Sequence, residues 1–234
     1  EYDAAGRILA ATGPTGAAVR NRYDALGRTV AVEAPNGQQT RFEYLGDTSW
    51  VKTIIQPDGT RRAFEYDSHG NLTTAKIGAE LITALTYHPD GSVATVQGWG
   101  QPERRFAYHP DGRLKAVTNA LGETTRLEYD SRGNLIRETN PLGGVTLRSY
   151  DPHDQLVSLT DPSGLTIRYA SDTVGRLSEI IDPAGGAARY HYDTRGRVVA
   201  ETHRSGQTSR YEYDPAGRLA RAIRPGGRVE SVRY

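Results

Sequence analysis

The chain contains no cysteine and no methionine among its 234 residues. The absence of cysteine excludes disulfide bonds and thiolate metal sites. No run of about 18 apolar residues occurs, so neither a membrane-spanning helix nor the core of a signal peptide is predicted. Basic and acidic residues nearly balance, at 29 and 28, and the net charge of +1 offers no electrostatic surface for nucleic acid or an anionic membrane.

Hydrophobic side chains are also scarce. They make up 36% of the chain, whereas ordinary globular domains hold roughly 45–50% by a definition that includes glycine. Glycine and proline are abundant, at 26 and 12 residues, and both favour turns. We therefore expect many turns, short strands and a large surface for the mass, instead of a thick hydrophobic core.

Tyrosine recurs along the chain at a nearly fixed step. The step is 21 residues, except that one interval is 22 and one is two steps wide with Ser171 at its midpoint. A fixed period of roughly 20–50 residues is typical of repeat architectures. The chain also begins and ends inside the motif, so we predict one array of about eleven repeats over residues 1–234, an internal fragment of a larger protein. The repeated tyrosines are Tyr2, Tyr23, Tyr44, Tyr66, Tyr87, Tyr108, Tyr129, Tyr150, Tyr192, Tyr213 and Tyr234.

Each repeat carries two turn signals. The tyrosine is followed by Asp-x-x-Gly-Arg and an aliphatic residue, as over residues 213–219, and a second turn, Asp-Pro-x-Gly, comes later, as over residues 161–164. An aspartate side chain can accept hydrogen bonds from the N–H groups of a turn, and glycine tolerates a positive φ. The glycines of the first turn, predicted with the tyrosines to be the structural signature, are Gly6, Gly27, Gly70, Gly91, Gly112, Gly133, Gly175, Gly196 and Gly217.

Between the turns lie two runs short enough to be strands. The run that leads to the tyrosine alternates: Leu127, Glu128 and Tyr129 show an apolar residue, a polar residue and the tyrosine in turn. Such alternation is typical of a half-buried strand and predicts that the two apolar columns share one face. The run after Gly-Arg alternates less well, as over residues 135–139. Its register stays open, and a β-bulge is one explanation.

The sequence therefore predicts an all-β fold. Tandem β-hairpins, each a 21-residue repeat, are expected to join into one continuous antiparallel sheet. With neighbouring strands about 4.8 Å apart, some 22 strands would make a ribbon about 105 Å wide. Open twisted sheets of more than about ten strands curl, split or close, so we do not expect a flat sheet.

At these residues the sequence resembles the YD-repeat, or Rhs (rearrangement hotspot), family. The recurring Tyr-Asp-x-x-Gly-Arg-Leu, Asp-Pro-x-Gly and aromatic-x-Tyr motifs carry the resemblance over essentially the whole chain. Departures are local: Leu45, His88 and His109 replace the aspartate, Asp154 replaces the glycine, and Ser171 replaces the tyrosine.

This resemblance implies a long sheet that spirals as part of a hollow shell, similar to the shells of insecticidal toxin complexes, and encloses a C-terminal toxin domain before delivery. The chain would then be a non-enzymatic shell segment of a bacterial effector, made in the cytoplasm and exported, for instance by type VI secretion. Its partners would be the rest of the same shell, the enclosed toxin domain and a component of a secretion apparatus.

Two rival functions stay open. One is an extracellular, cell-surface repeat region for adhesion or carbohydrate binding, because aromatic columns can stack on sugars. The other is a self-cleaving shell, since the family's shells can end in two Asp-Pro-x-Gly boxes that act as an aspartyl autoprotease. Asp161 and Asp182 stand in such boxes, but at the ordinary repeat step. A protease would need two carboxylates placed so that one holds a proton.

Histidine and aspartate recur together at His88 and Asp90 and at His109 and Asp111. A metal site needs three or four convergent ligands, and the simpler interpretation is a first turn with histidine in the aspartate position. We therefore predict no catalytic, cofactor-binding or metal-binding residues, and no cofactor.

Overall fold

The computed structural model describes residues 1–232 and 234. Within these residues the chain consists of β-strands and one short 3-10 segment, η1 (Pro225–Gly227). It divides into two compact units, Glu1–Glu123 and Thr124–Tyr234. No helix in the described residues is long and apolar enough to cross a membrane.

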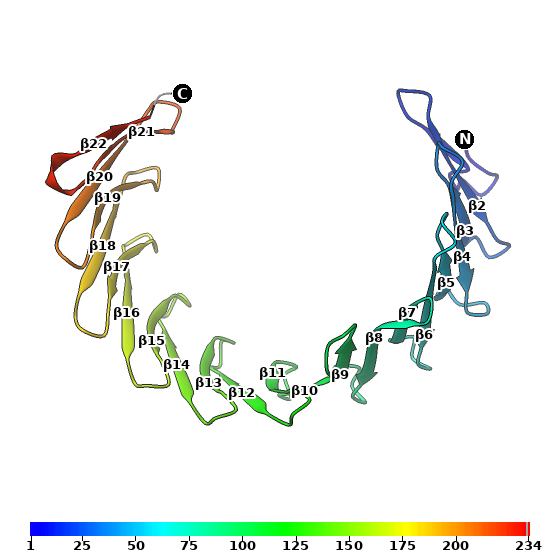
Figure 1. Cartoon of the computed structure of the whole chain (residues 1–234), viewed down its shortest axis with the longest axis horizontal. Helices are drawn as coiled ribbons and strands as arrows, with labels where there is room; N and C mark the ends of the chain where they lie inside the picture. Colours follow the sequence, from blue (N-terminus) through cyan, green and yellow to red (C-terminus); the bar gives the residue numbers. More distant parts are fainter. Residues whose placement is uncertain (233) are drawn as a thin grey trace. The chain divides into compact units, whose positions relative to one another are not determined.

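The first unit holds strands β1 to β11. Each strand is antiparallel to the next one in chain order, and short turns join them (Figure 1). The strands are β1 (Ala10–Thr12), β2 (Ala18–Tyr23), β3 (Thr29–Glu33), β4 (Gln39–Tyr44), β5 (Val51–Ile55), β6 (Arg61–Tyr66), β7 (Leu72–Ile77), β8 (Glu80–Tyr87), β9 (Val93–Gly98), β10 (Arg104–Tyr108) and β11 (Leu114–Thr118).

The second unit holds strands β12 to β22, again paired antiparallel in chain order. The prediction of an all-β chain built from antiparallel hairpins is thus confirmed in both units. The strands are β12 (Thr124–Tyr129), β13 (Leu135–Thr139), β14 (Val145–Tyr150), β15 (Leu156–Thr160), β16 (Thr166–Ser171), β17 (Leu177–Ile181), β18 (Ala187–Tyr192), β19 (Val198–Thr202), β20 (Thr208–Tyr213), β21 (Leu219–Ile223) and β22 (Val229–Ser231).

The two turns of a repeat share one geometry. In the first turn at Asp214, the N–H of Asp214 donates to the carbonyl of Arg218 at 2.8 Å, and the N–H of Gly217 donates to the carbonyl of Asp214 at 2.9 Å. The second turn at Asp182 repeats this pattern with Gly185. Gly217 and Gly185 have φ values of 86° and 88°. This is a three-residue hairpin loop in which a type I turn ends on a left-handed residue, so glycine is needed there.

A β-bulge lies at the start of the descending strand, which we define as the strand that follows the first turn. Between β20 and β21, Glu212 is opposite Arg221 but Tyr213 is opposite Leu219, so Ala220 has no opposing residue. The same shift occurs at the repeated tyrosine position in the other hairpins of both units. The bulge settles the register that the sequence left open and explains the weak alternation.

Consecutive hairpins are joined by a shorter ladder. β19 pairs with β20 only from Ala200 to Thr202. Val198, at the bulged end of β19, therefore has no partner in this ladder. Three-residue ladders also join other hairpins in both units. At each of these short ladders, a backbone carbonyl at the bulged end of the strand needs another hydrogen-bond donor.

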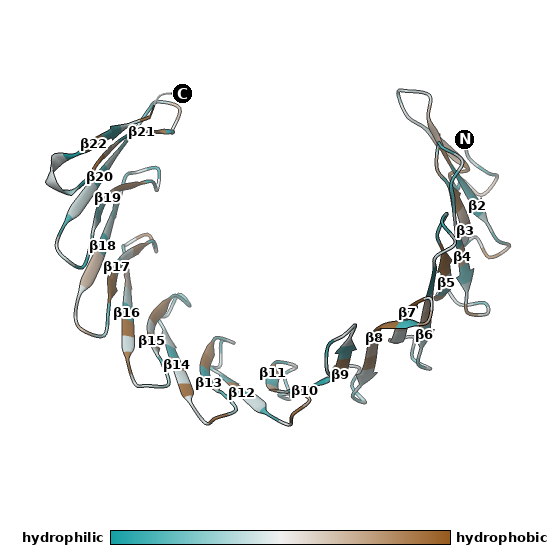
Figure 2. Cartoon of the chain, in the orientation of Figure 1, coloured by the Kyte–Doolittle hydropathy of each residue, from teal (hydrophilic) through white to brown (hydrophobic). Residues whose placement is uncertain are grey.

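The repeated tyrosine and the apolar residue two positions before it lie on one face of the strands. In β10, Phe106 and Tyr108 are half-buried, whereas Ala107 between them is exposed. They stand opposite Val117 and Leu114 of β11, so they share one face, as the alternation predicts. Figure 2 shows apolar and polar residues interspersed along the strands. Among the described residues, the buried ones are Ala31, Ala222, Thr53 and Ser209. Contacts between neighbouring repeats must therefore supply most of the stability.

Candidate functional site

The tyrosine joint, represented here by Asp193, Arg197, Val198 and Tyr213, connects one repeat to the next. The hydroxyl of Tyr213 donates to the carbonyl of Val198 at 2.8 Å. The short ladder leaves this carbonyl without a backbone partner, so the side chain replaces a missing backbone hydrogen bond. The same bond, to the carbonyl fifteen residues earlier, is made at 2.7–3.1 Å by Tyr23, Tyr44, Tyr66, Tyr87, Tyr150 and Tyr192.

Asp193 and Arg197 form the other side of the joint. Oδ1 of Asp193 accepts from the N–H groups of Arg195 and Arg197 at 2.9 Å, and Oδ2 accepts from Nε of Arg197 at 2.7 Å. The pair holds the guanidinium over the ring of Tyr213, with Cζ 4.4 Å from the ring centroid. The arrangement recurs at 4.5–4.7 Å in four further joints: Asp3, Arg7 and Tyr23; Asp24, Arg28 and Tyr44; Asp172, Arg176 and Tyr192; Asp214, Arg218 and Tyr234.

The turn keeps these aspartates ionised. The hydrogen bond from the backbone N–H of Arg197 is the largest effect on the pKa of Asp193 and lowers it; the Arg197 side chain lowers it further, while partial desolvation opposes both. The pKa values of Asp3, Asp172 and Asp214 are lowered for the same main reason. An ionised carboxylate locked to a guanidinium orients the arginine and has no proton to exchange near neutral pH. The arrangement is therefore suited to holding repeats together.

Two family models match parts of this chain. The RHS Repeat model matches residues 108–146, 150–187, 172–208 and 192–229, just over half of the chain. This chain belongs to the RHS repeat family. The Teneurin YD-shell model matches residues 1–80. A search of the curated proteins finds no match.

Solved structures show where this RHS repeat fold also occurs. The crystal structure of TcdB2-TccC3-TEV matches 99% of this chain with a TM-score of 0.69 at 18% identity. TcdB2-TccC3 matches 100% with 0.63 at 15%, and TcdB2-TccC3 without its hypervariable C-terminal region matches 95% with 0.64 at 15%. At these identities the likeness establishes a shared fold. The chain spans only 15–16% of the length of those chains.

The predicted signature residues occupy fixed places in the RHS repeats. The repeated tyrosines Tyr23 and Tyr213, for example, end the strands β2 and β20. The nine predicted glycines all lie in first turns, with φ between 78° and 98°. The sequence did not reveal the arginine contact, because each arginine stands sixteen residues before the tyrosine that it covers. The sequence feature that could have predicted this contact is Asp-x-x-Gly-Arg in one repeat together with the tyrosine of the next repeat.

The repeat between Tyr44 and Tyr66, whose step is 22 residues instead of 21, has tryptophan in place of the arginine. Trp50 stands directly before Val51, at the arginine position of the motif, and its ring centroid lies 5.6 Å from that of Tyr66 with an interplanar angle of 30°. The hydroxyl of Tyr66 still donates to the carbonyl of Val51 at 2.9 Å. The inserted residue is taken up by the loop after Tyr44, and the bulged register is kept. Trp50 therefore covers the tyrosine in place of a guanidinium.

His88 also takes part in a tyrosine joint. Its Nε2–H donates to the carbonyl of Phe106 at 2.9 Å, and its ring meets Tyr108 edge-on with centroids 6.1 Å apart. Asp90 takes over the capping of the turn, because its Oδ1 accepts from the N–H of Ser92 at 2.9 Å. Across the residues that the structure describes, no group of three or more histidine, cysteine, aspartate or glutamate side chains is arranged to hold a metal ion.

Asp161 and Asp182, the two carboxylates considered for self-cleavage, both hold second turns. Oδ1 of Asp161 accepts from the N–H and the hydroxyl of Ser163 at 2.8 and 2.6 Å. Oδ1 of Asp182 accepts from the N–H of Ala184 at 3.0 Å, and Oδ2 lies 3.3 Å from a guanidinium nitrogen of Arg204. The hydroxyl of Ser163 is the main cause that lowers the pKa of Asp161. A pair of carboxylates that shares a proton would instead have one raised pKa.

Proposed function

We propose that this chain is a segment of the wall of a hollow shell. The complete protein would be a bacterial Rhs-type toxin or effector whose shell encloses a C-terminal toxin domain until delivery. The observation that carries the proposal is the tyrosine joint, whose hydroxyl bond links successive hairpins at seven positions in a chain that belongs to the RHS repeat family. The fold shared with the TcdB2-TccC3 structures supports it.

The physical character of the repeats fits a wall. Buried side chains are few in the described residues, so neighbouring repeats stabilise one another as they do in other repeat arrays. Residues 1–234 would form an array of about eleven repeats within a longer one. Its partners would be the rest of the same shell, the enclosed toxin domain and a secretion component. The protein would be made in the bacterial cytoplasm and exported.

The carbohydrate-binding alternative is less well supported. A sugar stacks on the open face of an aromatic ring, but in five joints a guanidinium lies 4.4–4.7 Å from the tyrosine centroid and covers one face. The match of residues 1–80 to the Teneurin YD-shell model supports a shell architecture and does not distinguish adhesion from enclosure.

Protease protection in the complete protein tests the enclosure. We expect the C-terminal domain to resist a protease in the intact protein and to be digested in a variant that lacks residues 1–234. As a control, a recognition site for the same protease is placed in the second turn at Leu142, which is 94% exposed. Rapid cutting there shows that the protease is active. Equal digestion of the C-terminal domain with and without the repeats would refute the proposal.

The structural role of the Asp-Pro-x-Gly turns is tested separately. Asparagine can accept the same turn hydrogen bonds, as the Oδ1 of Asn140 does from the N–H of Gly144 at 2.8 Å. We therefore expect Asp161→Asn and Asp182→Asn to leave any self-cleavage of the complete protein unchanged. Loss of cleavage in a variant that keeps its β-sheet circular dichroism would favour the self-cleaving alternative.

A further inference from the structure

The joint between the repeats of Tyr66 and Tyr87 lacks its covering side chain. Asn71 occupies the arginine position, and its Nδ2 donates to Oδ2 of Asp67 at 3.0 Å. The hydroxyl of Tyr87 still donates to the carbonyl of Leu72 at 2.7 Å, so the ring keeps its usual place. No arginine in the described part of the chain lies over Tyr87. An open hollow of about 620 Å³ takes the place of the guanidinium.

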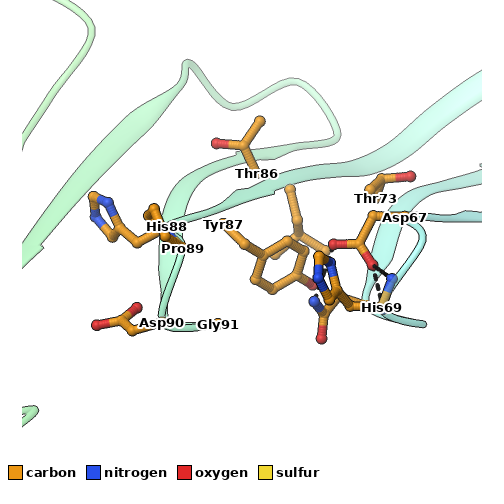
Figure 3. Close-up of a pocket in the computed structure, with 11 residues that line it drawn as sticks. Asp67, His69, Thr73, Thr86, Tyr87, His88, Pro89, Asp90 and Gly91 are labelled. Carbon is orange, nitrogen blue, oxygen red and sulfur yellow. Dashed lines mark hydrogen bonds between the residues drawn. The ribbon is translucent and has the colours of Figure 1, made fainter.

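The residues that line this hollow include two aspartates and two histidines. Figure 3 shows Asp67 and His69 beside the ring of Tyr87, with Asp90 in the wall formed by the next turn. The ring of His88 points away from Tyr87 in the same view, toward its own contact with Tyr108. The carboxylate of Asp67 forms no ion pair among the described residues, and its Oδ2 receives only the neutral amide of Asn71. A negative charge and an uncovered aromatic face thus border one cavity.

The other joints show which group this cavity fits. In five of them the same two features, the Oδ2 of the first-turn aspartate and the face of the next tyrosine, hold one guanidinium at 2.6–2.8 Å and 4.4–4.7 Å respectively. We propose that the hollow at Tyr87 binds the side chain of an arginine residue from another polypeptide. The incoming guanidinium would lie between Asp67 and the ring of Tyr87, in the place that the protein's own arginine fills elsewhere.

The chemistry favours arginine over other ligands. A guanidinium is planar, so it can stack on Tyr87 while its edge donates to Asp67, whereas the ammonium of lysine is a strongly hydrated point charge. A neutral sugar would stack on the ring but would leave the charge of Asp67 without a counterion.

A second joint with asparagine provides the matched control. Asn134 also stands at the arginine position, and its Nδ2 donates to Oδ2 of Asp130 at 3.1 Å. There, however, Arg132 of the same turn reaches the following turn, where it donates to the carbonyls of Asp151 and Pro152 at 2.8 Å. Asn134 is not among the residues that line the hollow at Tyr87, so Asn134→Arg adds the same charge as Asn71→Arg without filling that hollow.

The experiment is a titration of the whole ¹⁵N-labelled chain with N-acetyl-arginine amide, followed by NMR. The amide signals of Gly70, Asn71 and Gly91 report on the hollow. We expect saturable shifts there, with an affinity about fivefold or more above that of N-acetyl-lysine amide, and no shifts with the uncharged citrulline analogue. Methyl glucoside serves as the sugar probe and should cause none.

Three variants decide the outcome. Asn71→Arg should fill the cavity from within and abolish binding, while Asn134→Arg should bind as the unmodified chain does. Asp67→Asn keeps the acceptor that caps the turn but removes the charge, so binding should fall about fivefold or more with the fold retained. The proposal is overturned if Asn71→Arg or Asp67→Asn binds the arginine probe unchanged, if no saturable shift occurs, or if methyl glucoside binds and the arginine probe does not. A failure here would leave the protease-protection result untouched, so the two proposals are separable.

Discussion

Replacing Tyr213 by phenylalanine isolates the hydroxyl of the tyrosine joint. This hydroxyl lies 2.8 Å from the carbonyl oxygen of Val198, and the ladder between β19 and β20 begins only at Ala200. A net hydrogen bond contributes about 0.5–1.5 kcal/mol to stability, and more is lost when the remaining partner stays unsatisfied. Phenylalanine keeps the ring under Arg197. We therefore expect the free energy of unfolding to fall by about 1 kcal/mol.

Urea denaturation followed by circular dichroism measures this loss, and amide hydrogen exchange locates it. Because each repeat is stabilised by its neighbours, protection should fall mainly in β19 and β20. Tyr190→Phe is the matched control, since its hydroxyl has no partner within the described residues and the change should stay within about 0.5 kcal/mol. If both variants lose the same stability, the carbonyl at Val198 does not depend on the tyrosine and the tyrosine joint is not a coupling element.

Three further predictions concern the turns. Gly70→Ala places a methyl group against the ring of Trp50, whereas Gly91→Ala, at a nearly equal φ, meets nothing within 4 Å. In urea denaturation, Gly70→Ala should therefore be less stable than Gly91→Ala by about 1 kcal/mol or more. Equal stabilities of the two variants would refute the contact. Asp154 has a φ of 63°, so Asp154→Ala should be about 1 kcal/mol less stable than Asp154→Gly, and the opposite order would contradict the strain. Hydrogen bonds from the Arg113 side chain lower the pKa of Asp111 from 3.8 to about 2. Stability from this lowered pKa is present above about pH 4 and is lost as the pH falls toward 2, so the urea midpoint of Asp111→Asn should vary less over this interval than that of the unmodified chain.

Much of the fold could be predicted because the turns are encoded locally. Aspartate and glycine three residues apart predict a turn from local sequence alone. The alternation before each tyrosine predicts the strand that ends at that tyrosine. The register of the descending strand could not be predicted. Leu135 and Ile136 are both apolar, so from the sequence either could be the residue paired with Tyr129 on the neighbouring strand. The bulge that selects Leu135 depends on pairing with the neighbouring strand.

The tyrosine joint was hidden for a related reason. Its members come from two repeats, and only the paired hairpins bring Arg197 over Tyr213. The predicted signature therefore contained the tyrosine and the glycine without the contact that explains the arginine. Trp50 departs from the motif in sequence, but in the structure it lies in the arginine's place on Tyr66.

The departures from the motif show what the joint requires. Arginine, tryptophan and histidine each contact a repeated tyrosine, at Tyr213, Tyr66 and Tyr108. These three side chains share little except a flat group that can lie against a ring, by its face or by its edge. The cover over the ring is thus not limited to one residue type, whereas the carbonyl accepts from a tyrosine hydroxyl in each joint where that bond is described. Asn71 does not cover the ring of Tyr87, because its short amide remains with the aspartate of its own turn. The hydroxyl of Tyr87 still reaches the carbonyl of Leu72, so at this joint the covering side chain is what is missing, and the hollow lies where that side chain would be.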